Sequence, residues 1–75
     1  MKALVEHIAK SLVDYPDAVQ VEEAQEERTT VLRLSVHPDD MGKVIGKQGK
    51  TAKAIRSVLY AANKQHERVR LDIAD

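Results

Sequence analysis

The sequence predicts an α+β fold in which one sheet of three strands is covered on one face by three helices. Apolar residues recur at helical spacing in three segments and alternate with polar residues in three others, in the order helix–strand–strand–helix–helix–strand. Each predicted strand is apolar on one face only, so a single covering layer suffices. With 75 residues, the chain has room for one domain, which we place at 1–75.

The N-terminal half predicts one helix and two strands. An amphipathic helix is expected over 2–14, where Pro16 stops it. A short strand over 19–22 runs into the acidic segment 22–27, which is too polar to bury and is expected to form a flexible hairpin loop. Residues 30–37 alternate between apolar and polar side chains and predict the second strand.

The C-terminal half predicts two helices and a strand. A short helix begins at 38–40, where acidic side chains favour the positive end of the helix dipole, and it ends at Gly46. A longer helix is expected over 50–64 and a strand over 67–73. The residues expected to form the apolar stripes of the two helices are Met41, Val44 and Ile45, followed by Ala52, Ile55, Val58, Leu59 and Ala62.

A net charge of zero conceals two segments of opposite sign. Residues 1–40 carry four basic and nine acidic groups, whereas 41–70 carry eight basic groups and one acidic group. Because a charged partner responds to the local field, the second segment is a candidate surface for a polyanion.

Composition and spacing exclude several classes of function. The chain has no cysteine, which removes disulfides and thiolate chemistry and suits the cytoplasm. It has no apolar run long enough to span a membrane. The histidines lack metal-ligand spacing, and the serines lack the context of a nucleophile. We therefore expect neither an enzyme nor a bound metal or cofactor.

The segment with the most chemical information is the connection between the two C-terminal helices. Gly46 and Gly49 enclose Lys47 and Gln48, so the backbone can turn tightly and approach a sugar–phosphate chain. The helix that follows begins with unpaired N–H groups, which favour a phosphate. A nucleotide-binding P-loop is excluded, since it requires glycine where Val44 stands. The basic residues around the connection are Lys43, Lys50, Lys53 and Arg56.

Residues 44–55, V-I-G-K-Q-G-K-T-A-K-A-I, resemble the signature of a KH domain, and the order of elements matches the type II form of that fold. Over its whole length the chain resembles the small bacterial single-KH proteins of the KhpA family. One departure is Ala52, where many KH domains have a larger aliphatic residue. The resemblance implies a single-stranded RNA site that clamps about four nucleotides. Its residues would be Gly46, Lys47, Gln48, Gly49, Lys50, Lys43, Lys53, Arg56 and Ile45, with Ala52 and Ile55 in the adjoining groove or in the core.

The resemblance further implies a cytoplasmic RNA chaperone or post-transcriptional regulator, with links to cell-envelope growth and cell length. It implies a homodimer, or a heterodimer with a larger KhpB-type RNA-binding protein. Two alternatives stay open. The domain could serve mainly to pair with another chain, through an exposed apolar side chain such as Val58, or it could bind single-stranded DNA with the same clamp.

Overall fold

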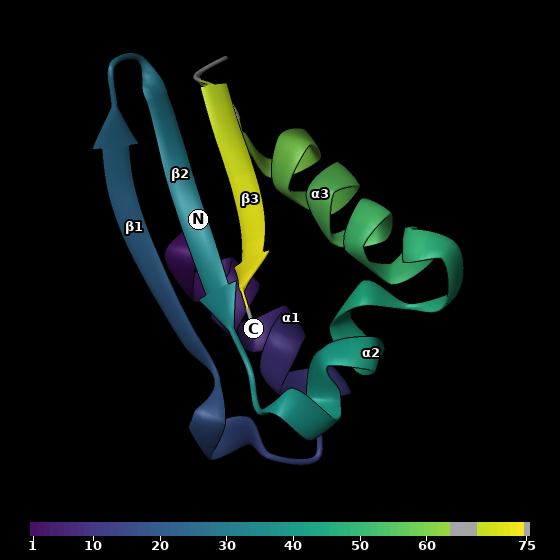
Figure 1. The fold of residues 1–75 in the computed structure, drawn as a ribbon. Coiled ribbons are helices and arrows are strands. Elements are labelled where there is room, and N and C mark those ends of the chain that lie inside the picture. The colour runs from purple at the N-terminus through teal and green to yellow at the C-terminus, as the bar shows by residue number, and fades with distance from the viewer. Residues whose placement is uncertain (64–67, 75) are drawn as a thin grey trace.

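The computed structural model describes residues 1–63 and 68–74, and its order of elements is the predicted one (Figure 1). Short 3₁₀ turns precede β1, α2 and α3. The helices and strands are α1 (Lys2–Leu12), β1 (Gln20–Glu26), β2 (Thr29–Ser35), α2 (Met41–Ile45), α3 (Lys50–Ala62) and β3 (Arg68–Ala74).

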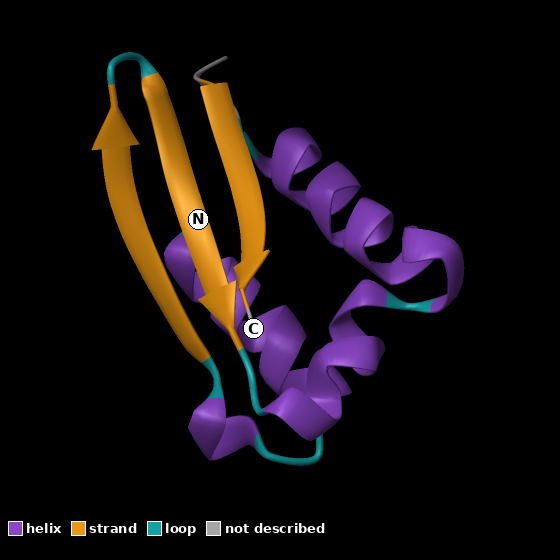
Figure 2. Ribbon diagram, in the orientation of Figure 1, coloured by secondary structure: helices purple, strands orange, loops and turns teal. Residues whose placement is uncertain are grey.

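The three strands form one mixed sheet in the order β1-β2-β3. β1 and β2 are antiparallel, whereas β2 and β3 are parallel and are joined by a crossover that contains α2 and α3. The helices lie on one side of this sheet (Figure 2), as predicted. Between the layers is a core whose fully buried members include Val5, Leu32, Leu34, Val44, Leu59 and Leu71.

The acidic segment 22–27 is strand rather than the predicted hairpin loop. β1 continues to Glu26, and each of its residues has a partner in β2. Glutamate is tolerated here because β1 is an edge strand whose side chains from position 22 onward are exposed, and charge on an edge prevents further pairing. Only residues 27–28 remain between the strands, and Glu27 closes the turn with a positive φ of 53°.

The first helix ends two residues before the predicted limit of 14. The cause is Asp40, a buried residue at the start of α2, whose carboxylate accepts hydrogen bonds from the backbone N–H of Asp14 (3.2 Å) and of Tyr15 (2.9 Å). The segment after α1 is therefore bonded to the start of α2. The ring of Tyr15 adds to this junction by stacking on His37, with 4.1 Å between ring centroids.

Two other predicted limits fall near residues that the structure does not describe. α3 ends at Ala62, so the predicted helical position 63 is outside it and position 64 lies outside the described residues. The last strand begins at Arg68 among the described residues, and its predicted first position, 67, is not described.

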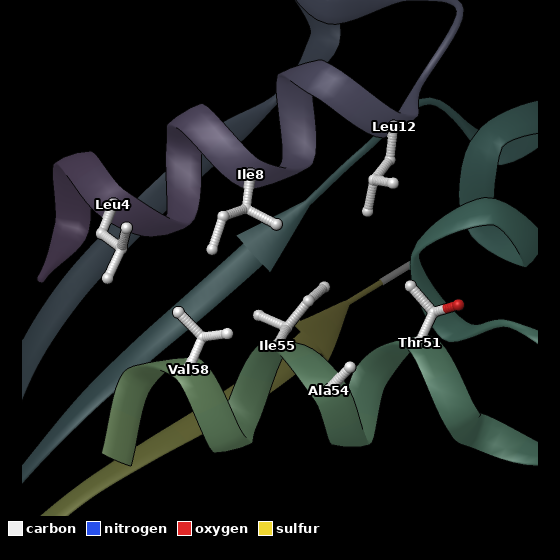
Figure 3. Close-up of a pocket in the computed structure, with 7 residues that line it drawn as sticks. All are labelled: Leu4, Ile8, Leu12, Thr51, Ala54, Ile55 and Val58. Atoms are coloured by element: carbon white, nitrogen blue, oxygen red, sulfur yellow. The ribbon is translucent and has the colours of Figure 1, made fainter. Parts of the chain in front are cut away.

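The predicted apolar stripes are corrected at three positions. Ile45 is 38% exposed and Val58 is 46% exposed, and Ala62 is exposed as well. Ala52, Ile55 and Leu59 are buried as expected. Within α3, the buried residues lie on the side that faces the sheet, whereas Val58 faces α1 across a groove (Figure 3).

Candidate nucleic-acid interface

The connection between α2 and α3 projects from the side of the molecule opposite β1 (Figure 1). Its backbone turns sharply, because Gly46 (φ 76°, ψ 170°), Gln48 (φ 59°) and Gly49 (φ 74°) all have positive φ. Two hydrogen bonds hold Gly46: its N–H donates to the carbonyl of Gly42 (2.8 Å), and its carbonyl accepts the N–H of Gly49 (3.1 Å). The turn is therefore fixed at its first glycine. We refer to residues 46–49 as the clamp.

The clamp presents unpaired backbone donors. Lys47 and Gln48 begin a helical turn, so their N–H groups have no partner within it. No backbone hydrogen bond from either N–H to another element is found among the residues that the structure describes. Both side chains are exposed. Together with the positive end of the α3 dipole, these amides can bind an anion such as a phosphate.

The predicted cations around the clamp divide into free and engaged groups. Lys47, Lys50 and Lys53 are exposed and form no ion pair within the described part of the chain. They follow the turn into the first part of α3 and add positive charge beside the free amides.

Lys43 is held away from this free group. Its ammonium group is hydrogen-bonded to the carboxylate of Asp14 and lies 3.7 Å from that of Asp40. The hydrogen bond to Asp14 raises the pKa of Lys43; desolvation acts in the opposite direction, but the charges of both carboxylates add to the increase, and the pKa is raised overall. Lys43 thus joins α2 to the segment after α1, and its charge is balanced locally.

Arg56 is half-buried between α3 and β3. Its guanidinium group donates to the carbonyl of Leu71 in β3 (3.2 Å), which leaves other N–H donors of the group for a ligand. Ile45, at the end of α2, is exposed next to the clamp, whereas Ala52 and Ile55 lie in the core. Ile45 is therefore a surface residue, and Ile55 is a residue of the hydrophobic core.

Sequence reasoning did not identify Asp40 or Thr51. Asp40 was interpreted only as a helix-starting residue. Burial by itself would raise the pKa of Asp40, but hydrogen bonds from the amides of Asp14 and Tyr15, with the charges of Lys43 and His37, outweigh burial and lower this pKa. Thr51 packs directly against Gly46. The Asp40 contacts could not be found from spacing, because Asp14 and Tyr15 lie 26 and 25 positions away. The Thr51 contact is local, but it depends on the angles at which the chain turns between α2 and α3.

An apolar groove lies between α1 and α3 (Figure 3). Its volume is about 390 Å³ and its walls are almost entirely apolar. Leu12 and Val58 are 39% and 46% exposed, so much of their apolar surface faces solvent at this groove. The groove is lined by Leu4, Ile8, Leu12, Thr51, Ala54, Ile55 and Val58.

Residues 1–63 and 68–74 contain neither a metal-binding cluster nor a membrane-spanning helix. Within these ranges no group of histidine, cysteine, aspartate or glutamate side chains is arranged to hold a metal ion. Nor does this part of the chain contain a helix with the length and hydropathy needed to cross a membrane.

The sequence is similar to a known family of bacterial proteins. Residues 2–73 match the family described as KhpA/KhpB, KH domain. The chain is 67% identical to the RNA-binding protein KhpA of Halalkalibacterium halodurans, over 100% of both chains. It is 60% identical to the protein of the same name from Clostridium acetobutylicum, over 97% of this chain and 99% of the relative. Identity to Bacillus subtilis KhpA is 47%, over 100% of this chain and 94% of the relative.

The fold is also similar to part of a larger protein. The crystal structure of Aquifex aeolicus Era bound to GDP and aluminium fluoride superposes with a TM-score of 0.60. The superposition covers 96% of this chain and 28% of the Era chain, at 19% sequence identity. At this identity the similarity concerns the fold alone.

Proposed function

The chain belongs to the KhpA/KhpB family of KH domains, and we propose that it binds single-stranded RNA through the clamp. The observation that carries the proposal is the clamp itself, where free amides of residues 47 and 48 lie at the positive end of α3 beside exposed lysines. Its curated relatives are named RNA-binding proteins, and the family is not one of enzymes.

In this proposal, phosphates contact the clamp amides together with Lys47, Lys50 and Lys53. About four nucleotides fit such a clamp. Bases that follow the clamped phosphates pass between Ile45 and the side of α3 that carries Arg56, whose remaining N–H groups can donate to base acceptors. Lys43 contributes by holding α2 in place, since two carboxylates already balance its charge.

The test compares RNA binding by wild type and by the double variant Lys47→Asp, Gln48→Asp, using a fluorescent oligonucleotide of about eight uridines. Aspartate tolerates positive φ better than glutamine does, so the variant is expected to fold. The matched control is Lys10→Asp, Gln20→Asp, which makes the same two replacements at exposed positions in α1 and β1. We expect the clamp variant to lose binding and the control to keep it, with circular dichroism confirming both folds. Equal binding by the two variants would refute the proposal.

The same assay separates RNA from DNA. If the clamp recognises phosphates alone, an unlabelled DNA oligonucleotide of equal length will compete as well as RNA does. We propose RNA as the ligand and expect RNA to compete better. From the family resemblance, we further propose a cytoplasmic role as an RNA chaperone or post-transcriptional regulator in cell-envelope growth and cell length.

A second candidate function is pairing, and the apolar groove favours it. Val58 and Leu12 line the groove and are both exposed, so this apolar surface could be covered by the same surface of a second copy in a two-fold contact. Because the net charge of the chain is zero, two copies have no net charge repulsion to overcome as they associate. Pairing with a larger KhpB-type protein would use the same surface.

Sedimentation of Val58→Asp tests the pairing proposal. A buried unpaired carboxylate would prevent the apolar contact, so this variant is expected to be monomeric at concentrations where wild type is a dimer. Ser57→Asp adds the same charge one position away, on an exposed part of α3, and is expected to pair normally. A Val58→Asp dimer as stable as that of wild type would exclude the groove as the pairing surface.

A further inference from the structure

Tyr60 is an exposed aromatic residue near the end of α3. It is 55% exposed, the highest value among the large hydrophobic residues that the structure describes. Within residues 1–63 and 68–74, its hydroxyl group has no hydrogen-bond partner and its ring has no stacked neighbour. The ring therefore has a face available to a ligand.

The other aromatic residue, Tyr15, is already engaged within the fold. The chain contains two tyrosines and no phenylalanine or tryptophan. The ring of Tyr15 is stacked on His37, and carboxylates surround this pair: Asp14 precedes Tyr15, and Asp39 lies 3.8 Å from His37. Because carboxylates repel a polyanion, Tyr60 is the aromatic residue that remains for a nucleic acid.

Tyr60 continues a row of side chains along α3. Helical residues three, four and seven positions apart lie on one face, so Lys53, Arg56 and Tyr60 form a single row. This face is turned toward β3, since Arg56 donates to the carbonyl of Leu71, and α3 and β3 lie side by side (Figure 1). The row therefore leads from the clamp side of α3 along the edge of β3 to Tyr60.

The row has the length of a short nucleic-acid strand. At about 1.5 Å per residue, the stretch of α3 from Gly49 to Tyr60 is about 16 Å long. Four nucleotides cover about 14 Å even at the spacing of about 3.4 Å found in a stacked strand. A strand of about four nucleotides that is held at the clamp therefore reaches Tyr60.

We propose that Tyr60 is a base-stacking residue of the RNA site, which binds the base at the end of the strand farthest from the clamp. This inference rests on the proposed function, because the clamp places the strand on this face of α3. Lys53 and Arg56 lie between the two contacts. Every base has a π-face, so the ring adds affinity without adding a strong preference for one base.

Substitutions at Tyr60 test the stacking role. Tyr60→Ala is expected to weaken octauridine binding by about fivefold or more, whereas Tyr60→Phe keeps the ring and is expected to bind within about twofold of wild type. Tyr60→Leu keeps an apolar side chain without a ring and should bind like Tyr60→Ala. Alanine and leucine favour a helix more than tyrosine does, so circular dichroism should show folded variants. The slope of log affinity against log salt should equal that of wild type in all three, because a neutral ring neutralises no phosphate.

Tyrosine fluorescence gives a second readout, which does not depend on affinity. Tyr15→Phe keeps a ring beside His37 and leaves Tyr60 as the only tyrosine in a chain without tryptophan. The emission of this variant is expected to decrease as octauridine saturates it, because a stacked base quenches the ring. The same additions to N-acetyltyrosinamide correct for light that the RNA absorbs. Unchanged emission at saturation would overturn the proposal.

The affinities separate this inference from the clamp proposal. Wild-type affinity in Tyr60→Ala, together with loss of binding in Lys47→Asp, Gln48→Asp, would overturn the stacking role and leave the clamp standing. Wild-type affinity in both variants would overturn both proposals. Wild-type affinity in Tyr60→Leu would also overturn the stacking role, because apolar bulk without a ring would then be sufficient.

Discussion

Gly46 and Gly49 stand at the two ends of the clamp but serve it in different ways. Gly46 has a φ of 76° and a ψ of 170°, a region that essentially only glycine adopts, and Thr51 fills the space beside it. Gly49 has left-handed helical angles, and nothing lies within 4 Å of a Cβ built on it. The first glycine is required by conformation and by packing, whereas the second is required by conformation alone.

A series of glycine-to-alanine variants measures this difference. Gly49→Ala is expected to lower the free energy of unfolding by about 1–2 kcal/mol, the cost of a left-handed residue with a Cβ. Gly46→Ala adds a clash with the backbone of Thr51 and is expected to cost about 3 kcal/mol or more. Gly42→Ala is the control, since a Cβ meets nothing within 4 Å there and alanine favours the helix. Urea unfolding measures the free energy of unfolding of each variant. Equal losses in Gly49→Ala and Gly46→Ala would contradict the expected order.

Asp40 is expected to make stability depend on acid pH. Its pKa is lower in the folded chain than in the unfolded chain, so the unfolded state binds its proton first as pH falls. The stabilisation is complete above the unfolded value of about 3.9 and is lost as pH decreases through the lower folded value. Thermal unfolding between about pH 6 and pH 2 should show this loss in wild type.

Asp40→Asn isolates that contribution from the other carboxylates. The variant is expected to unfold at a lower temperature than wild type at neutral pH, because the two N–H groups bond to different carboxylate oxygens and asparagine replaces one of these with an NH2 donor. The difference between the two proteins should shrink in acid. A difference that stays constant over the whole range would show that Asp40 does not contribute through its charge.

Among the elements, α2 is the one whose position depends most on side chains outside it. It has five residues, which is too few for stability in isolation. Val44 anchors it in the core, Asp40 binds the segment after α1, and Lys43 is bonded back to Asp14. These contacts hold the start of the clamp in place.

Lys43→Met should therefore affect the fold more than RNA binding. Methionine keeps much of the side-chain length but cannot pair with Asp14 and Asp40. The unfolding temperature is therefore expected to fall by a few degrees. The salt dependence of RNA binding is expected to stay unchanged. Lys50→Met is the comparison at an exposed position. It should leave stability unchanged and reduce the slope of log affinity against log salt by about 0.7. The opposite pattern would place Lys43 in the RNA interface.

The sequence predicted the order and type of all six elements because their apolar periodicity is strong. It did not predict that β1 extends through the acidic segment, since β1 derives its pairing from β2 rather than from its own composition. The tight turn at Gly46 and Gly49 was predictable, because glycine adopts positive φ readily and both residues have it. The sequence did not predict that Lys43 is paired while Lys47 is free, because Asp14, which binds Lys43, lies 29 positions away from it.

Among the residues that the structure describes, the glutamates of β1 and the lysines around the clamp lie on different sides of the molecule. The glutamates of β1 lie at one edge of the sheet, and the clamp projects from the opposite side (Figure 1). Arg70 of β3 is engaged away from the clamp, since its guanidinium group lies 3.2 Å from the carboxylate of Asp72 and 3.9 Å from that of Glu26. A polyanion is therefore attracted to the clamp side and repelled at β1.

The salt dependence of RNA affinity tests the central claim most directly. Octauridine binding is measured between about 50 and 300 mM salt for wild type, for Lys47→Asp, Gln48→Asp and for Lys10→Asp, Gln20→Asp. With two or three clamped phosphates, wild type and control should show a slope of about −1.4 to −2.1, whereas the clamp variant should bind too weakly to measure or with a much smaller slope. A wild-type affinity independent of salt, or the same slope in the clamp variant, would contradict phosphate binding at residues 46–49.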